Sequence, residues 1–167
     1  PNSNKIKERS SEDLMTEYAA KTRIRCRDIM TGSVRTATRE NTLRDAAVMM
    51  RDGDMGSVPV VENGRLVGIL TDRDIVVRSV ADGRGPDASV SEAMTTDIFS
   101  VRPDDFVFEA IRLMGDKQVR RVPVVDDEGR LAGIIAMADI ALEMEDEREI
   151  AETLEEISSG SGFWNKK

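Results

Sequence analysis

Thr71 and Asp74 stand three residues apart where an apolar run ends and a helix is expected to begin. A hydroxyl and a carboxylate at this spacing can cap the helix, because each accepts a hydrogen bond from an unpaired backbone N–H. The same pair can hold a ligand, because a carboxylate accepts hydrogen bonds from a vicinal diol and a helix N-terminus attracts phosphate. The residues alone leave both roles open and favour capping.

The phrase around this pair occurs twice. Residues 68–76 read GILTDRDIV and residues 133–141 read GIIAMADIA, so Ala136 replaces the hydroxyl while Asp139 keeps the carboxylate. An alanine cannot cap, and a cap-to-alanine change costs roughly 0.5–2 kcal/mol. The sequence therefore predicts two related positions with unequal chemistry.

The elements that position these residues belong to an internal repeat. DIMT at 28–31 recurs as EAMT at 92–95, and SVPVVENGRLVGIL at 57–70 recurs as RVPVVDDEGRLAGII at 121–135. Apolar spacing predicts helices near 42–50, 106–114, 74–80 and 139–144. β-Branched runs on either side of turn residues predict hairpins over 58–70 and 122–135. Each copy thus reads strand, helix, strand, strand, helix, and two copies of roughly 55 residues are expected to pack together.

The composition excludes several functional classes. The chain has 32 acidic and 24 basic residues, a net charge of −8 and no histidine, so no His-based triad, general base or metal site can form. The single cysteine, Cys26, excludes an internal disulfide and a cysteine zinc cluster, and we expect it to be a packed apolar residue. Asp72 and Asp74 fit acid–base or metal chemistry by type, but no other residues converge on them, so we do not expect an enzyme.

The charge pattern and the apolar runs bear on partners and location. Eight acids gather at 143–156 and the rest of the chain is nearly neutral, so nucleic acid is not expected as the primary ligand. No apolar run approaches the roughly 20 residues of a membrane helix, and residues 1–10 lack a signal pattern. We therefore expect a cytoplasmic protein without a membrane partner.

DIMT, the two Val-Pro strands, the turns ending in Gly-Arg-Leu and the GILTDRDI phrase together resemble the cystathionine β-synthase (CBS) domain. The tandem pair resembles a Bateman module, and its short flanks are similar to stand-alone bacterial proteins of the hypoxic-response type. The resemblance implies an α+β fold of two βαββα units with pseudo-twofold symmetry. The expected organisation is a flank with a short helix (1–22), one CBS domain at 23–83, a second at 84–145, and an acidic helix extension with a flexible tail (146–167).

The resemblance also implies a role in signal transduction, such as a stress response. In modules of this family the clefts bind adenosine compounds. The resemblance therefore implies AMP, ADP or ATP as the regulatory ligand, with NAD or S-adenosylmethionine as alternatives, and no catalytic cofactor. A homodimer and a downstream protein partner of unknown identity are expected. The alternative function is a structural or interaction dimer that keeps the fold without using a ligand.

The family pattern assigns residues to two clefts. In one, Asp74 accepts from the ribose hydroxyls, Thr71 meets ribose or phosphate, and adenine lies against the first strand and the Val-Pro strand. Pro59 and Pro123 also fit simple edge-strand positions. The implied ligand-binding residues of this stronger site are Thr36, Val58, Pro59, Thr71, Asp74, Arg120 and Arg121. Those of the weaker second site are Ser57, Ser100, Val122, Pro123 and Asp139.

The basic pair Arg120 and Arg121 makes the two clefts unequal. In the family, basic residues at this position reach toward the phosphate of the ligand held by the other unit, here the Thr71 cleft. The first copy has Gly56 and Ser57 instead, so the second cleft lacks both cations and the hydroxyl. Charge-assisted hydrogen bonds contribute roughly 1.5–3 kcal/mol each, so one strong and one weak site are expected. An exposed surface pair is the alternative role for these arginines.

Overall fold

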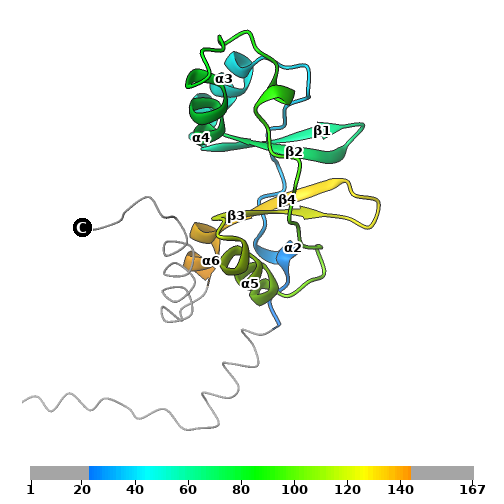
Figure 1. Cartoon of the computed structure of the whole chain (residues 1–167). Coiled ribbons are helices and arrows are strands. Elements are labelled where there is room, and N and C mark those ends of the chain that lie inside the picture. The colour runs from blue at the N-terminus through cyan, green and yellow to red at the C-terminus, as the bar shows by residue number, and fades with distance from the viewer. Residues whose placement is uncertain (1–22, 144–167) are drawn as a thin grey trace, which may run out of the picture.

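The computed structural model describes residues 23–143, which form two similar halves (Figure 1). The short helix expected in the N-terminal flank and the acidic stretch beyond residue 143 lie outside the described residues.

The first half follows the predicted order of elements. Helix α3 (Leu43–Gly53) leads into strands β1 (Ser57–Glu62) and β2 (Arg65–Thr71), and the chain continues through α4 (Asp72–Ile75) and the π-helix η1 (Val76–Val80). Helix α3 forms because Leu43, Ala46 and Met50 recur on one buried face. Its N-terminus is closed by a capping box in which Thr42 and Asp45 each accept the other's backbone N–H.

The second half repeats this order. It contains α5 (Val107–Lys117), strands β3 (Arg121–Val125) and β4 (Leu131–Ala136), and α6 (Met137–Glu143). Both hairpins are antiparallel and carry a register shift at the same place, between Val60 and Val61 and between Val124 and Val125. The mixed helix and strand architecture confirms the predicted α+β class.

The predicted first strand of each unit is reduced to a single residue. Ala37 forms one parallel bridge with Val60, and Val101 forms the equivalent bridge with Val124. The ladder ends there because the next backbone N–H turns to a side chain. Thr38 N donates to Asn41 Oδ1 over 2.7 Å, and Arg102 N donates to an Asp105 carboxylate oxygen over 2.7 Å. These local turns lead the chain directly into α3 and α5.

Each half is completed by a segment that precedes the other half in sequence. Helix α2 (Cys26–Ile29) packs in the second half, where Cys26 N donates to Asp105 O over 2.8 Å. The 3-10 helix η2 (Val90–Glu92) packs in the first half, where Val90 N donates to Asn41 O over 2.8 Å. The DIMT and EAMT motifs are therefore the exchanged segments.

Two glycines admit the exchanged segments. Thr31 bridges Ile134 and Thr95 bridges Ile69, each next to a glycine on the same strand. A Cβ on Gly133 would lie 2.8 Å from the Thr31 carbonyl oxygen, and one on Gly68 would lie 3.2 Å from that of Thr95 and 2.7 Å from Met94 sulfur. A larger residue would push the segment off the strand, so the glycine in GIL and GII is a docking requirement.

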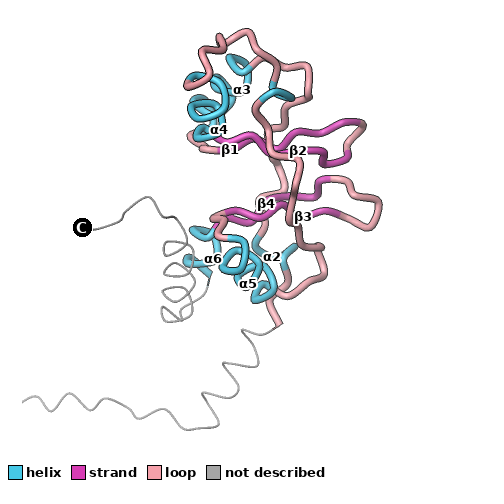
Figure 2. The backbone as a smooth tube through the Cα atoms, viewed as in Figure 1, coloured by secondary structure: helices cyan, strands magenta, loops and turns pink. Residues whose placement is uncertain are grey.

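The two hairpins face each other and the helices lie on the outer sides, α3 and α4 over one hairpin and α2, α5 and α6 over the other (Figures 1 and 2). The hairpin tips meet at a bridge between Arg65 and Arg130, with Leu66 N donating to Gly129 O over 3.1 Å. Each half has its own buried apolar cluster, one around Leu70 and one around Ile135. None of the helices formed by residues 23–143 combines the length and apolar character that crossing a bilayer requires.

Candidate functional site

The capping role of Thr71 and Asp74 is present in full. Thr71 Oγ1 accepts from Asp74 N over 3.0 Å, and Asp74 Oδ2 accepts from Thr71 N over 3.0 Å and from Thr71 Oγ1 over 2.8 Å. Both contacts that the Asp74 carboxylate accepts reach one oxygen, Oδ2. The capping box therefore fixes the carboxylate and leaves Oδ1 for other partners.

Oδ1 of Asp74 faces Arg78, one helical turn further on. The Arg78 Nη2 atom lies 3.5 Å from Oδ1, and the side chain of Asp74 is only 14% exposed. Sequence reasoning missed Arg78, although an acid and a base four residues apart on an expected helix are a recognised pairing signal.

The equivalent position in the second half keeps part of this arrangement. Asp139 Oδ2 accepts from Ala136 N over 2.9 Å, so the carboxylate half of the box remains. The hydroxyl half is missing because residue 136 is alanine, and Glu143 stands where the repeat places Arg78. Among residues 23–143, no cation pairs with Asp139.

The predicted adenine-contact residues lie together within each half. Thr36 precedes Ala37, whose N–H donates to Pro59 O over 2.9 Å. Val58 is fully buried in the apolar cluster of the first half, so a ligand at this strand would meet the backbone of Val58. Pro59 is also fully buried, on the opposite side of the strand from Val58 because strand side chains alternate.

The second half has the same layout. Val101 N, next to Ser100, donates to Pro123 O over 3.0 Å. Val122 is fully buried in the second cluster, and Pro123 is fully buried on the opposite face of β3. The buried prolines match each other, as the repeat requires.

Arg120 and Arg121 stand at the start of β3, beside the cap position of α6. Arg121 pairs with Ala136 across the hairpin, and Arg120 O accepts from Met137 N over 2.9 Å. Both residues are exposed, and neither guanidinium forms a hydrogen bond or ion pair with a residue of the described part of the chain. Their predicted reach toward Thr71 and Asp74 stays a prediction. Ser57, opposite Thr71 in the first hairpin, is buried.

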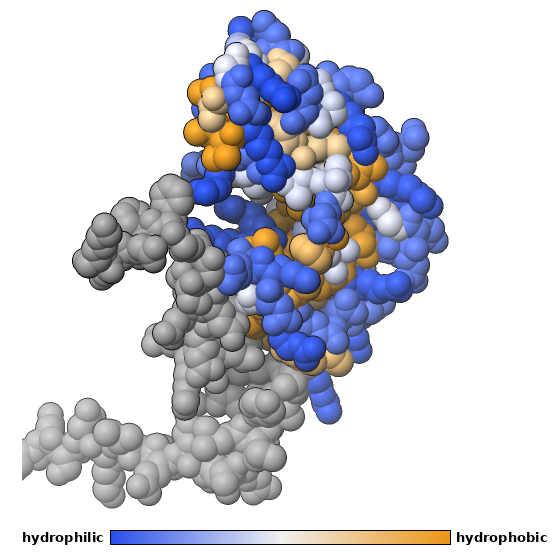
Figure 3. Space-filling model, in the orientation of Figure 1, coloured by the Kyte–Doolittle hydropathy of each residue, from blue (hydrophilic) through white to orange (hydrophobic). Residues whose placement is uncertain are grey.

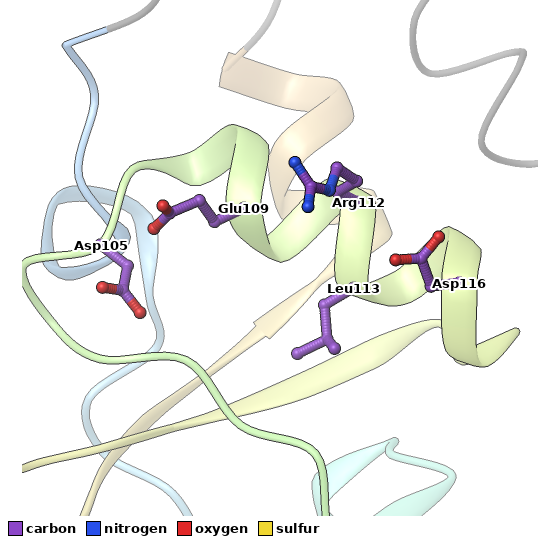
Figure 4. A pocket seen from close by; sticks show the side chains of 5 residues that line it. All are labelled: Asp105, Glu109, Arg112, Leu113 and Asp116. Carbon is purple, nitrogen blue, oxygen red and sulfur yellow. The ribbon is translucent and has the colours of Figure 1, made fainter.

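A cavity of about 340 Å³ lies along α5, away from these residues. Figure 4 shows its lining side chains on α5 and on the loop before it. They are Asp105, Glu109, Arg112, Leu113 and Asp116. Three acids around one arginine make this an acidic hollow, and it contains none of the residues that the sequence assigns to ligand binding.

Cys26 is packed in the apolar cluster of the second half, as expected. Burial, reinforced by the negative charges of Asp105 and Glu109, raises the pKa of its thiol to about 12. The thiol therefore stays protonated near neutral pH, and it has no nucleophilic role there. Among residues 23–143, no group of His, Cys, Asp or Glu side chains is arranged to hold a metal ion.

The chain belongs to the CBS domain family, which it matches at residues 26–80 and 90–146, one stretch in each copy of the repeat. Proteins of this family are generally regulatory modules. The match covers both copies of the repeat and includes Thr71, Asp74 and Asp139.

Two curated relatives are similar over most of their length. The CBS domain-containing protein YhcV of Bacillus subtilis is 39% identical over 132 residues, which is 79% of this chain and 94% of that protein. Hypoxic response protein 1 of Mycobacterium tuberculosis is 41% identical over 117 residues, or 69% of this chain and 81% of that protein. The predicted similarity to hypoxic-response proteins is therefore confirmed.

Three solved structures share the fold. Hypoxic Response Protein I, solved with two coordinated zinc ions, has a TM-score of 0.67 at 39% identity, covering 72% of this chain and 98% of that chain. The CBS domain pair of MJ0100, in complex with 5-methylthioadenosine and S-adenosyl-L-methionine, has a TM-score of 0.65 at 28% identity (71% and 94% covered). The cytosolic domain of the Mg2+ channel MgtE, in complex with ATP, has a TM-score of 0.63 at 29% identity (79% and 54% covered).

Proposed function

We propose that this chain is a regulatory module that binds an adenosine-containing ligand, with AMP, ADP or ATP preferred, and that it is not an enzyme. The observation that carries the proposal is the fixed carboxylate of Asp74, which keeps Oδ1 outside the capping box at a helix N-terminus. The complexes of MJ0100 with S-adenosyl-L-methionine and of MgtE with ATP support an adenosine compound as the ligand. A cytoplasmic location and a role in a stress response are parts of the same proposal.

In the proposed strong site, Asp74 accepts from the ribose hydroxyls and Thr71 lies next to the ribose or the phosphate. Arg120 and Arg121 neutralise the phosphate from the other half. Their guanidinium groups are exposed and have no partner among the described residues, so they are available to an anion. The second site, built on Asp139, lacks the hydroxyl and has Gly56 and Ser57 in place of the arginines, so we expect weak binding there.

Ligand binding regulates only if the ligand prefers one of two conformations of the protein. Pro59 is fully buried on the face of β1 opposite the apolar cluster of its half, so a base stacked on that face must displace the groups that cover Pro59. This requirement links occupancy to the contact between the two hairpins. The proposed signal is a change in how the halves meet.

A thermal-shift screen tests ligand binding. AMP, ADP, ATP, NAD and S-adenosylmethionine are added to the full chain over a concentration range. A ligand at 100 times its dissociation constant stabilises the folded state by about 2.7 kcal/mol, which corresponds to about 5–10 °C in Tm for a chain of this size. No shift with any of the five compounds would refute the proposal and favour a ligand-free interaction protein.

Arg120→Ala and Arg121→Ala test the phosphate role. Each is expected to weaken AMP binding by about 10-fold or more, since a hydrogen bond to a charged group contributes roughly 1.5–3 kcal/mol. Adenosine binding is expected to change little. Arg44→Ala is the matched control, because Arg44 is an exposed arginine on α3 that pairs with Asp87. Equal losses of affinity for AMP and adenosine would show that the arginines do not contact the phosphate.

An apolar face on the first half supports a homodimer. Val76, Val77 and Val80 on η1 are 57%, 51% and 62% exposed, and Val48 on α3 is 38% exposed. In Figure 3, apolar atoms gather at the outer edge of the upper half, where Figure 1 places α4. Proteins with CBS pairs often form dimers, and we infer that a second copy covers this face.

Sedimentation of Val77→Lys tests the dimer. We expect the variant to be monomeric at concentrations where the wild type is dimeric, with AMP affinity retained. Asp82→Lys, which introduces the same charge at an exposed loop position close to η1, is the control. A monomeric wild type would refute the dimer and leave ligand binding to stand on the thermal-shift result.

A further inference from the structure

Arg78 connects the carboxylate of the proposed ligand site to the segment that joins the two halves. Its Nη2 atom faces Asp74 Oδ1 at 3.5 Å. Its Nη1 atom donates to Ala93 O over 3.0 Å and to Thr95 Oγ1 over 3.0 Å. One planar guanidinium therefore contacts both Asp74 and the exchanged segment that docks on β2.

The contacts of Asp74 divide between its two oxygens. Oδ2 is occupied by Thr71, through a backbone N–H and a hydroxyl, both within 3.0 Å. Oδ1 has only the longer contact to Arg78, so it keeps acceptor capacity for a hydroxyl of a ligand. The orientation of Oδ1 is set from both sides, by the capping box and by Arg78.

The same frame without the arginine exists in the second half. Thr31 takes the place of Thr95 and bridges Ile134 as Thr95 bridges Ile69. The residue equivalent to Arg78 is Glu143, whose charge would repel the carboxylate of Asp139. The helix also differs, because η1 is a π-helix closed by Ala81 N donating to Val76 O over 3.0 Å, whereas α6 is a regular helix through Glu143.

From this arrangement we infer that Arg78 is a positioning residue. It holds Asp74 Oδ1 in the orientation that receives the ribose diol. Through its bonds to Ala93 and Thr95, it also couples ligand binding at that carboxylate to the position of the connector. The inference rests on the proposed function, because it concerns the same site. In this role Arg78 contacts neither the adenine nor the phosphate. By orienting Asp74, it sets how strongly the site prefers a nucleotide whose ribose carries both hydroxyls.

Discrimination between two nucleotides that differ only in the diol tests the inference. Dissociation constants for AMP, 2′,3′-dideoxy-AMP and adenosine are measured by calorimetry on the wild type and on Arg78→Gln. Wild-type protein is expected to prefer AMP over the dideoxy compound by about 10- to 100-fold, the range that one hydrogen bond to a charged group supplies. Arg78→Gln is expected to lower that preference by about 10-fold and to leave the AMP-to-adenosine ratio unchanged.

Two further variants separate positioning from general stability. Arg78→Lys keeps the charge and is expected to restore at least half of the lost preference. Thr95→Val removes one tether of the guanidinium and is expected to lower the preference by about 3-fold. Arg51→Gln, on an exposed arginine of α3 paired with Asp52, is the control and is expected to match the wild type.

The outcomes are distinct. Wild type that binds none of the probes would refute the proposed function and this inference together. Wild type that binds AMP, with the same sugar preference in Arg78→Gln, would refute the inference alone. A change confined to the AMP-to-adenosine ratio would also refute it, because Arg78 would then be a phosphate ligand.

Discussion

The first and second halves share one backbone and differ in a few polar side chains. Both have a register shift at the same place in the hairpin, a single parallel bridge before the first helix, and an exchanged segment docked on a glycine. The first half adds Thr71 and Arg78 around its carboxylate, and the second has Ala136 and Glu143 at those positions. Apolar residues and glycines thus determine the shared backbone. The side chains of Thr71 and Arg78 determine whether the carboxylate is held in one orientation as a hydrogen-bond acceptor.

The largest effect is expected for Asp74→Ala against Asp139→Ala. We expect Asp74→Ala to weaken AMP binding by about 100-fold or more, since it removes a charged acceptor and its bonds to the diol. Asp139→Ala is expected to change the affinity by less than about 3-fold. Calorimetric titration measures both, with circular dichroism to verify folding. Equal losses would show that the two sites work alike.

The glycines give the next largest effect, on stability. Gly133→Ala places a Cβ 2.8 Å from a backbone oxygen, whereas Gly68→Ala mainly meets a flexible methionine. Overpacking costs roughly 1–3 kcal/mol, and we expect Gly133→Ala near the upper end and Gly68→Ala near the lower. Urea midpoints at constant slope measure the difference. Gly85→Ala, where an added Cβ meets nothing within 4 Å, is the control.

The cap positions give a smaller, reciprocal effect. Thr71→Ala is expected to lower the unfolding free energy by roughly 0.5–2 kcal/mol because it leaves the Asp74 N–H without its acceptor. Ala136→Thr is expected to raise it by up to about 1 kcal/mol by completing the box with Asp139. Thermal unfolding of both variants measures the pair. A higher unfolding free energy for Thr71→Ala than for the wild type would show that Thr71 lowers the stability of the folded state.

The smallest effect is expected for Cys26→Val, which places in the second half the residue that the first half has at the equivalent position, Val90. Both positions are fully buried, so the swap is expected to change the unfolding free energy by less than about 1.5 kcal/mol at pH 7. Equilibrium unfolding in urea is the measurement. A larger loss would mean that the two cores are shaped differently.

The wild type and Cys26→Val are also expected to differ in how their stability changes at high pH, where the thiol ionises. The folded-state pKa of Cys26 is about 12, above its ordinary value of 9.0, so the folded state keeps a proton that the unfolded chain gives up. This contribution to stability is present in full below pH 9 and is lost as the pH rises toward 12. The wild type is therefore expected to lose stability relative to Cys26→Val over that range.

Much of the fold was predictable because the signals are local or repeated. Helical apolar spacing, β-branched runs and turn residues placed α3, α5 and both hairpins, and the Thr71–Asp74 spacing gave the capping box, which the structure confirms. The segment exchange was not predictable in this way. DIMT and EAMT look alike because they dock on like surfaces, and one sequence does not say which half each surface belongs to.

The site was predictable only in part, for the same physical reason. Thr71 and Asp74 are joined by local hydrogen bonds, whereas the contacts of Arg78 with Ala93 and Thr95 join residues 15 and 17 apart through the fold. The burial of Val58 likewise depends on an apolar cluster assembled from α3, both strands and η2, which no local pattern contains. The predicted reach of Arg120 and Arg121 across the halves stays a prediction.

The exchanged segments also govern the order in which this chain is able to fold as it leaves the ribosome. The first half has its helices and hairpin by Val80, yet its apolar cluster lacks Val90, Ala93 and Met94 until the connector has been synthesised. Residues 24–31, made before either half, have no surface to join until β4 exists. A fragment cut at the connector would leave both cores unfilled, so the two CBS copies are expected to form and to melt together.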